Sequence, residues 1–171
     1  MAQALKVPKQ FPGQLICGGV VHQLTLHGPY GGNGGTSWND GTTHNGVRKI
    51  ILSYKKGESG GIGTFSVIYS DGTKTEHKSG DNTYTQVTIE LDPGEVIEKL
   101  SGYTGAVPGA LTTAEVVRSL TIKTNQDTYS YGVKEGNAFS TPTIPDDSTI
   151  AGFVGRTSGD YLNAIGLYEK S

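Results

Sequence analysis

The sequence predicts an all-β protein, and three observations carry this prediction. Glycine is abundant, with 26 residues among 171 against only seven prolines, and the glycines stand between short apolar runs. Charged residues make up only 18% of the chain. No stretch of about 10–12 residues has the apolar stripe of an amphipathic helix. Many tight turns between short strands are typical of a sandwich, a barrel or a prism.

The chain is predicted to consist of a short arm and one domain. Residues 1–19 have no clear period and contain proline and glycine, so they are predicted as an N-terminal arm or tail that can be disordered. Residues 20–171 form a single domain, because a hydrophobic content of 34% suffices for one core in a chain of this length. Cys17 is the only cysteine, which excludes an internal disulfide and a zinc site made of several thiolates.

The first half of the domain alternates strand and turn signals. The glycine-rich run Gly28–Gly35 is predicted as a loop, and Ser70-Asp71-Gly72-Thr73 as a two-residue hairpin turn. β-Branched and aromatic content predicts strands at Val20–His27, Val47–Lys55, Thr64–Ser70 and Lys74–Lys78.

The second half continues the pattern, with turns at Asp92-Pro93-Gly94-Glu95 and Asn125-Gln126-Asp127. Strands are predicted at Gln86–Leu91, Val96–Leu100, Val116–Thr124, Thr128–Tyr131, Ala138–Thr141, Thr149–Val154 and Leu162–Tyr168. Three aspartates stand beside glycine or proline and are predicted as turn residues: Asp40, Asp71 and Asp92.

Charge and hydropathy exclude two classes of partner. The net charge is −2 and lysines are mixed with acids along the chain, so no basic patch predicts a nucleic-acid ligand. No apolar run approaches the ~20 residues of a membrane span, so membrane insertion is not expected. Prolines and glutamines also interrupt the first residues, and no secretory signal is evident. A cytoplasmic location, with the nucleus as a second compartment, is therefore predicted.

The sequence predicts neither a metal or other cofactor nor catalysis. The four histidines are scattered and show no His-Glu-x-x-His spacing. The loop at Gly28–Gly35 lacks the Gly-Lys-Ser/Thr ending of a phosphate-binding loop. A glycosidase needs two carboxylates about 5–9.5 Å apart, and the candidate ligand loop contains Asp160 alone.

That candidate loop lies between the last two predicted strands. Its sequence, Gly155-Arg156-Thr157-Ser158-Gly159-Asp160-Tyr161-Leu162-Asn163-Ala164-Ile165-Gly166, combines glycines that permit a sharp turn with hydrogen-bonding and aromatic side chains. Such a mixture suits a neutral ligand rich in hydroxyl groups.

Seven motifs in this order resemble the jacalin-related lectins, and the resemblance covers the chain from Gly28 to Tyr168. They are Gly28–Gly35, Trp38-Asn39-Asp40-Gly41, Asn45–Ile50, Phe65–Tyr69, Ser101–Gly105, Val116–Leu120 and Gly155–Gly166. The resemblance implies a β-prism I of three four-stranded Greek-key sheets with pseudo-threefold symmetry. It also implies a sugar site at one end of the prism, where three loops converge.

The resemblance assigns the sugar contacts to three loops. The first loop would provide Gly34 and Gly35, the latter through its backbone N–H. The third would provide Gly159, Asp160, Tyr161, Leu162 and Asn163, with backbone N–H groups at 160 and 161 and the side chain at 163. The second would tune recognition through Gly109, Ala110, Leu111, Thr112, Thr113, Ala114 and Glu115. An uncut first loop resembles the branch of the family that binds mannose- or glucose-containing glycans.

Asn163 departs from the family pattern, which has aspartate at this place. A carboxylate accepts from two hydroxyls, whereas an amide has one acceptor and one donor group. Two readings stay open: a lectin whose site uses the amide, or a jacalin-like interaction module whose sugar binding is weakened or lost. Because one shallow sugar site is weak, a homodimer or higher oligomer is also expected.

Overall fold

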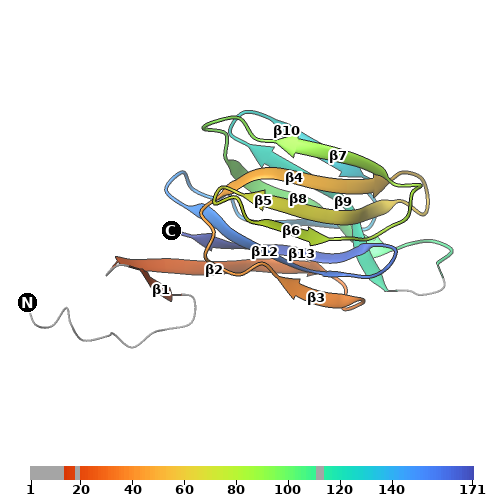
Figure 1. Cartoon of the computed structure of the whole chain (residues 1–171). Coiled ribbons are helices and arrows are strands. Elements are labelled where there is room, and N and C mark those ends of the chain that lie inside the picture. The colour runs from red at the N-terminus through yellow and green to blue at the C-terminus, as the bar shows by residue number, and fades with distance from the viewer. Residues whose placement is uncertain (1–13, 18–19, 111–113) are drawn as a thin grey trace, which may run out of the picture.

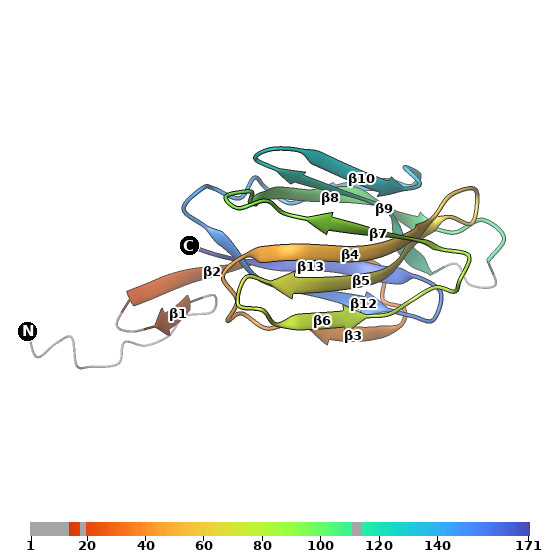
Figure 2. The ribbon, with the colours of Figure 1, turned by 45° about the horizontal axis from the view of Figure 1, so that its top comes forward.

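Three antiparallel sheets make up the part of the chain that the computed structural model describes, which is residues 14–17, 20–110 and 114–171. Within these ranges the regular elements are thirteen strands, and no helix there is long and apolar enough to cross a membrane. The strands of all three sheets run roughly along the long axis of the molecule (Figures 1 and 2). The all-β prediction is confirmed.

Two sheets share one strand order. In the β4 sheet, β7 (Thr85–Glu90), β4 (Val47–Lys55), β5 (Gly61–Tyr69) and β6 (Lys74–His77) are neighbours in that order. In the β8 sheet, the corresponding neighbours are β11 (Asn137–Ser140), β8 (Ile97–Ala106), β9 (Glu115–Thr124) and β10 (Thr128–Gly132). In both sheets the fourth strand returns beside the first, which is the Greek-key order.

The third sheet, named the β12 sheet, joins the two ends of the chain. Its order is β3 (Thr36–Asn39), β12 (Thr149–Thr157), β13 (Leu162–Lys170) and β2 (Val20–Gly31). If the strands are counted in the order β12, β13, β2 and β3, the fourth strand again lies beside the first. The β12 sheet therefore has the same Greek-key order. The three equivalent sheets form the expected β-prism.

One strand adds to the expected set of four. β1 (Gln14–Cys17) pairs with the free edge of β2, so the β12 sheet has five strands. Residues 14–17 fall within the segment predicted as an arm or tail, and they form a strand there. The rest of that segment, residues 1–13 and 18–19, lies outside the described residues.

The predicted loop at Gly28–Gly35 is shorter than expected. β2 continues to Gly31, which lies opposite Ala164, and β3 begins at Thr36, opposite Thr157. The glycine content predicted a loop, but the neighbouring strands β13 and β12 provide backbone partners that local propensity does not reveal. No strand was predicted at Thr36–Asn39, and the loop is reduced to residues 32–35.

The inner faces of the sheets enclose one hydrophobic core. Ile50 and Phe65 come from the β4 sheet, Leu120 from the β8 sheet, and Phe153 and Ile165 from the β12 sheet, and each is at most 1% exposed. The Phe65 and Phe153 rings meet edge to face, with 5.1 Å between their centroids. Alternate residues of a strand face the same side, so each sheet buries one side of its strands here.

A buried polar cluster joins the β4 and β12 sheets beside this core. The Asp40 carboxylate accepts hydrogen bonds from the Tyr69 hydroxyl at 2.6 Å, the Thr75 hydroxyl at 2.8 Å and His77 Nε2 at 2.8 Å. The Tyr69 hydroxyl in turn accepts the Phe153 N–H at 2.9 Å. The prediction that Asp40 is a turn residue was therefore incomplete, because its side chain fastens two sheets together.

Candidate functional site

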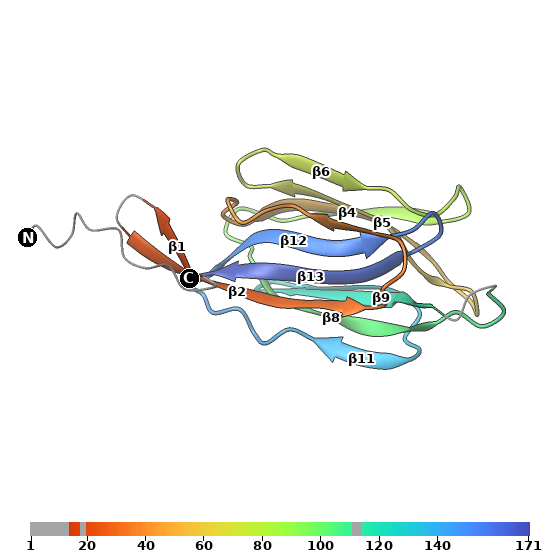
Figure 3. The ribbon, with the colours of Figure 1, turned by 90° about the horizontal axis from the view of Figure 1, so that it is seen from below.

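Three connections lie at the end of the prism away from the C-terminus and from β1 (Figures 1 and 3). The first loop, residues 32–35, joins β2 to β3. The second loop joins β8 to β9, and the structure describes its residues 107–110 and 114. The third loop, residues 158–161, joins β12 to β13. Two sheets therefore place the predicted sugar-binding residues at one end, although they are far apart in the sequence.

The first loop is fixed by contacts that require glycine. Gly35 has a φ of +70°, and a Cβ there would lie 2.5 Å from Thr157 O. A Cβ on Gly32 would lie 2.3 Å from Glu115 O, so the loop packs directly against the start of β9. The Gly32 N–H also donates to Asn163 O at 3.0 Å. The loop backbone is thus pressed against both neighbouring connections.

Arg156 completes the attachment of the first loop to the third. Its Nε donates to Gly34 O at 3.0 Å, and its Nη2 donates to Gly35 O at 3.1 Å. Arg156 has no ion-pair partner among the described residues. Its charge therefore lies beside the two glycines without a neutralising carboxylate. Sequence analysis missed this residue because the bonds span about 120 positions along the chain.

The third loop is a tight turn closed by its own residues. The Ser158 N–H donates to Tyr161 O at 3.0 Å, and the Tyr161 N–H donates to Ser158 Oγ at 3.3 Å. Gly159 at its tip is open, with no atom within 4 Å of an added Cβ, and Asp160 is exposed. The turn presents its polar tip to solvent.

Connections of the β4 sheet hold this turn from behind. Two hydrogen bonds come from the connection after β6: Ser79 Oγ donates to Ser158 O at 2.8 Å, and Gly80 N donates to Gly159 O at 2.9 Å. Tyr84 Oη donates to Asp160 O at 2.5 Å. From the turn itself, Tyr161 Oη donates to Ser59 O at 2.6 Å. Burial raises the pKa of the Tyr161 hydroxyl. Because that hydroxyl is bonded to the protein, Tyr161 anchors the loop, and Leu162 behind it lies fully in the core.

Asn163 occupies the point where the first and third loops meet. Its side chain is 3% exposed, and its Oδ1 has no hydrogen-bond partner in the described part of the chain, a state shared only with Ser119 Oγ. A Cβ added to Gly34 would lie 2.9 Å from Asn163 Nδ2, so glycine at 34 makes room for this amide. A buried oxygen without a partner is costly unless a ligand or water satisfies it.

The second loop contacts the same place at its C-terminal end. A Cβ on Gly34 would lie 3.8 Å from Ala114 Cβ, and Glu115 packs against Gly32 as described. Gly109 and Ala110 are exposed at its other end. The predicted recognition residues Leu111, Thr112 and Thr113 lie outside the described residues.

A second positively charged residue lies under this end of the prism. Arg118, only 3% exposed, donates to three backbone carbonyls, those of Gly60, Glu58 and Ala106, at 2.7, 2.9 and 3.3 Å. It likewise has no ion pair among the described residues. Its charge acts on Tyr161, where burial raises the pKa of the hydroxyl and the guanidinium opposes that rise. Sequence analysis missed Arg118 as well.

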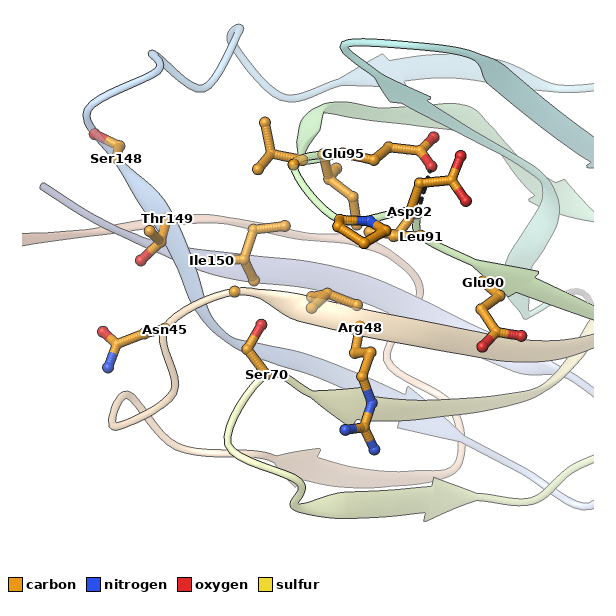
Figure 4. Close-up of a pocket in the computed structure, with 16 residues that line it drawn as sticks. Asn45, Arg48, Ser70, Glu90, Leu91, Asp92, Glu95, Ser148, Thr149 and Ile150 are labelled. Atoms are coloured by element: carbon orange, nitrogen blue, oxygen red, sulfur yellow. Dashed lines mark hydrogen bonds between the residues drawn. The ribbon is translucent and has the colours of Figure 1, made fainter.

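A separate cavity of about 540 Å³ lies at the opposite end of the prism (Figure 4). It is lined by the start of β4, the turn between β7 and β8, and the start of β12. Its buried carboxylate, Glu95, accepts hydrogen bonds from Asp92 N at 2.9 Å and Thr124 Oγ1 at 2.6 Å, so its bonding needs are met within the protein. None of the predicted site residues lines this cavity.

The loop end thus offers hydrogen-bonding groups from both backbone and side chains. In the described ranges no three His, Cys, Asp or Glu side chains are arranged to hold a metal ion. Fold and loops define a β-prism protein with three polar connections gathered at one end.

Comparison with known proteins places the chain within this class. The family model described as "Jacalin-like lectin domain" matches residues 27–168. A galactose-specific lectin from Morus indica is 42% identical over 140 residues, covering 78% of this chain and 83% of that protein.

Two solved structures are similar throughout the domain. The artocarpin–mannotriose complex has 44% identity and a TM-score of 0.75, covering 86% of this chain and 97% of that one. A mannose-specific jacalin-related lectin from Morus nigra, in complex with mannose, has 38% identity and a TM-score of 0.78, covering 95% and 100%. The chain belongs to the jacalin-like lectin family, whose members are carbohydrate-binding proteins and not enzymes.

Proposed function

We propose that this protein reversibly binds mannose- or glucose-containing glycans at the end formed by the three loops. One observation carries the proposal: Asn163 holds a buried oxygen without a partner where the first and third loops meet. A sugar hydroxyl has the donor that this oxygen lacks. The backbone N–H groups of Gly35 and Asp160, at the same end, would donate to further sugar oxygens.

The choice of mannose over galactose rests on relatives and on the first loop. The solved relatives include complexes with mannotriose and mannose, whereas the Morus indica relative is named galactose-specific. In this chain the first loop is glycine-rich, and Arg156 donates to its carbonyls. Its sequence resembles the first loop of the mannose-binding branch, which favours mannose, and galactose is the competitor to test.

Calorimetric titration tests the proposal directly. Methyl α-mannoside, galactose and a branched mannose oligosaccharide are titrated into the natural protein and into Asn163→Asp. We expect binding with mannose preferred over galactose, and an affinity of Asn163→Asp for the mannoside higher by roughly 5- to 150-fold, since the carboxylate accepts from two hydroxyls. Binding of galactose alone would refute the specificity. Silence of the natural protein with all three sugars would refute the function and leave a protein-interaction module.

Avidity requires more than one site, so we also propose a homodimer or higher oligomer. Light scattering coupled to size exclusion measures the mass in solution, and a monomer at all concentrations would contradict it. The cytoplasmic or nuclear location stays a prediction, to be checked by imaging the tagged protein.

A further inference from the structure

The Asn163 amide differs from a carboxylate in the kind of hydrogen bonds that it makes as well as in the strength of those bonds. An amide can donate through Nδ2 or accept through Oδ1, and a half-turn about its last bond exchanges the two groups. Because Oδ1 is held by no other group in the described part of the chain, no protein contact to that atom opposes such a turn. A carboxylate at the same place would only accept, and it would carry a negative charge at a residue position that is 3% exposed.

The surroundings of the amide carry positive charge that the described residues leave unpaired. The Arg156 guanidinium donates to the carbonyls of Gly34 and Gly35, and Gly34 is the residue of the two that faces the Asn163 amide. Arg118 lies buried beneath the third loop with only carbonyl partners. Two carboxylates share this end: Asp160 is exposed, and Glu115 is half-buried with Asn137 Nδ2 at 3.5 Å from its Oε1. Water screens exposed charges more strongly than buried ones.

We propose that this site accepts a hexuronic acid, a pyranose whose sixth carbon is a carboxylate, besides the neutral hexose. The inference rests on the proposed lectin function. The sugar carboxylate would accept from Asn163 Nδ2, within the field of Arg156. Glycans that contain glucuronic or mannuronic acid are the class of ligand that this chemistry recognises.

An aspartate at position 163 would make the same ligand unfavourable. Two like charges about 4 Å apart repel by about 1 kcal/mol even in bulk water, and by more in a partly buried site. This corresponds to at least a fivefold loss of affinity. The amide therefore determines specificity. Compared with an aspartate at position 163, it makes one hydroxyl contact fewer, and it does not repel acidic sugars.

A paired titration tests the proposal. Methyl α-mannoside and its C6-carboxylate form are titrated at neutral pH into the natural protein, Asn163→Asp and Asp146→Asn, at low and high salt. We expect the natural protein to bind both within about threefold of each other, with only the acid weakened by salt. Asn163→Asp should bind the neutral sugar more tightly than the natural protein does, and the acid at least fivefold more weakly. Asp146→Asn removes an exposed charge in the connection between β11 and β12, outside the three loops, and should change the ratio of the two affinities by less than about twofold.

The outcomes separate this inference from the proposed function. A natural protein that binds the neutral mannoside but rejects the acid as strongly as Asn163→Asp does would overturn the uronic-acid proposal and leave the lectin function intact. A natural protein that binds neither would overturn both, and binding of the acid alone would support the inference and narrow the function to acidic glycans.

Discussion

Gly34→Ala tests whether the glycine beside Asn163 serves the ligand site. The new Cβ would lie 2.9 Å from Asn163 Nδ2, closer than carbon and nitrogen atoms pack without a shift, and 3.7 Å from its Cγ, an ordinary contact. Gly34 is not among the glycines with positive φ, so alanine fits the backbone. The substitution should therefore displace the amide and leave the loop folded.

The expected effect is selective. Loss of one or two sugar hydrogen bonds costs about 1–3 kcal/mol, or a 5- to 150-fold lower affinity for the mannoside. The free energy of unfolding should change by less than about 1 kcal/mol, because alanine lowers the entropy of the unfolded chain while the amide absorbs the clash. Calorimetric titration and urea unfolding measure the two quantities on the same preparation.

Gly105→Ala is the matched control, since its Cβ would meet only Gly136 Cα at 3.3 Å and Glu135 O at 3.8 Å. It should bind the mannoside like the natural protein. Unchanged affinity in Gly34→Ala would refute the placement of Asn163 in the site. A large loss of stability in Gly34→Ala would show that the glycine supports the fold instead.

The buried cluster around Asp40 yields two further predictions. Tyr69→Phe removes a hydroxyl that donates to Asp40 and accepts from the Phe153 N–H, so urea unfolding should show a loss of about 2–4 kcal/mol. Tyr54→Phe, the control, should cost much less, and equal losses would contradict the role of the cluster. Burial alone would raise the pKa of Asp40, yet hydrogen bonds from His77 and Tyr69 hold that pKa below its ordinary value. Its contribution to stability is thus present above the unfolded pKa of about 3.9 and is lost as the pH falls through the lower folded pKa. Urea unfolding between about pH 2 and 5 should show this loss, which Asp40→Asn should reduce; equal pH dependence in both proteins would count against it.

Features that depend on residues adjacent in the sequence were predictable. Ser70-Asp71-Gly72-Thr73 forms a tight turn between β5 and β6 as predicted, because Gly72 adopts a φ of +87° and the Asp71 carboxylate accepts the Thr73 N–H. The strands that flank the third loop were likewise predictable, because the pattern that indicates them lies in their own adjacent residues. The prism itself came from the order of motifs along the chain, since alternation alone does not distinguish a prism from a sandwich or a barrel.

What the sequence by itself determined is therefore most of the strands and turns, and it supplied the residues predicted to contact the ligand, including Asn163. The tertiary structure decided which groups those residues meet. Arg156 reaches Gly34 and Gly35, and Tyr161 anchors to Ser59, across about 100 positions or more. Such pairs depend on how three sheets close around one core, and no local pattern encodes them. The missing partner of Asn163 Oδ1 is likewise a property of the assembled loops, because a side chain is unsatisfied only relative to its neighbours in space.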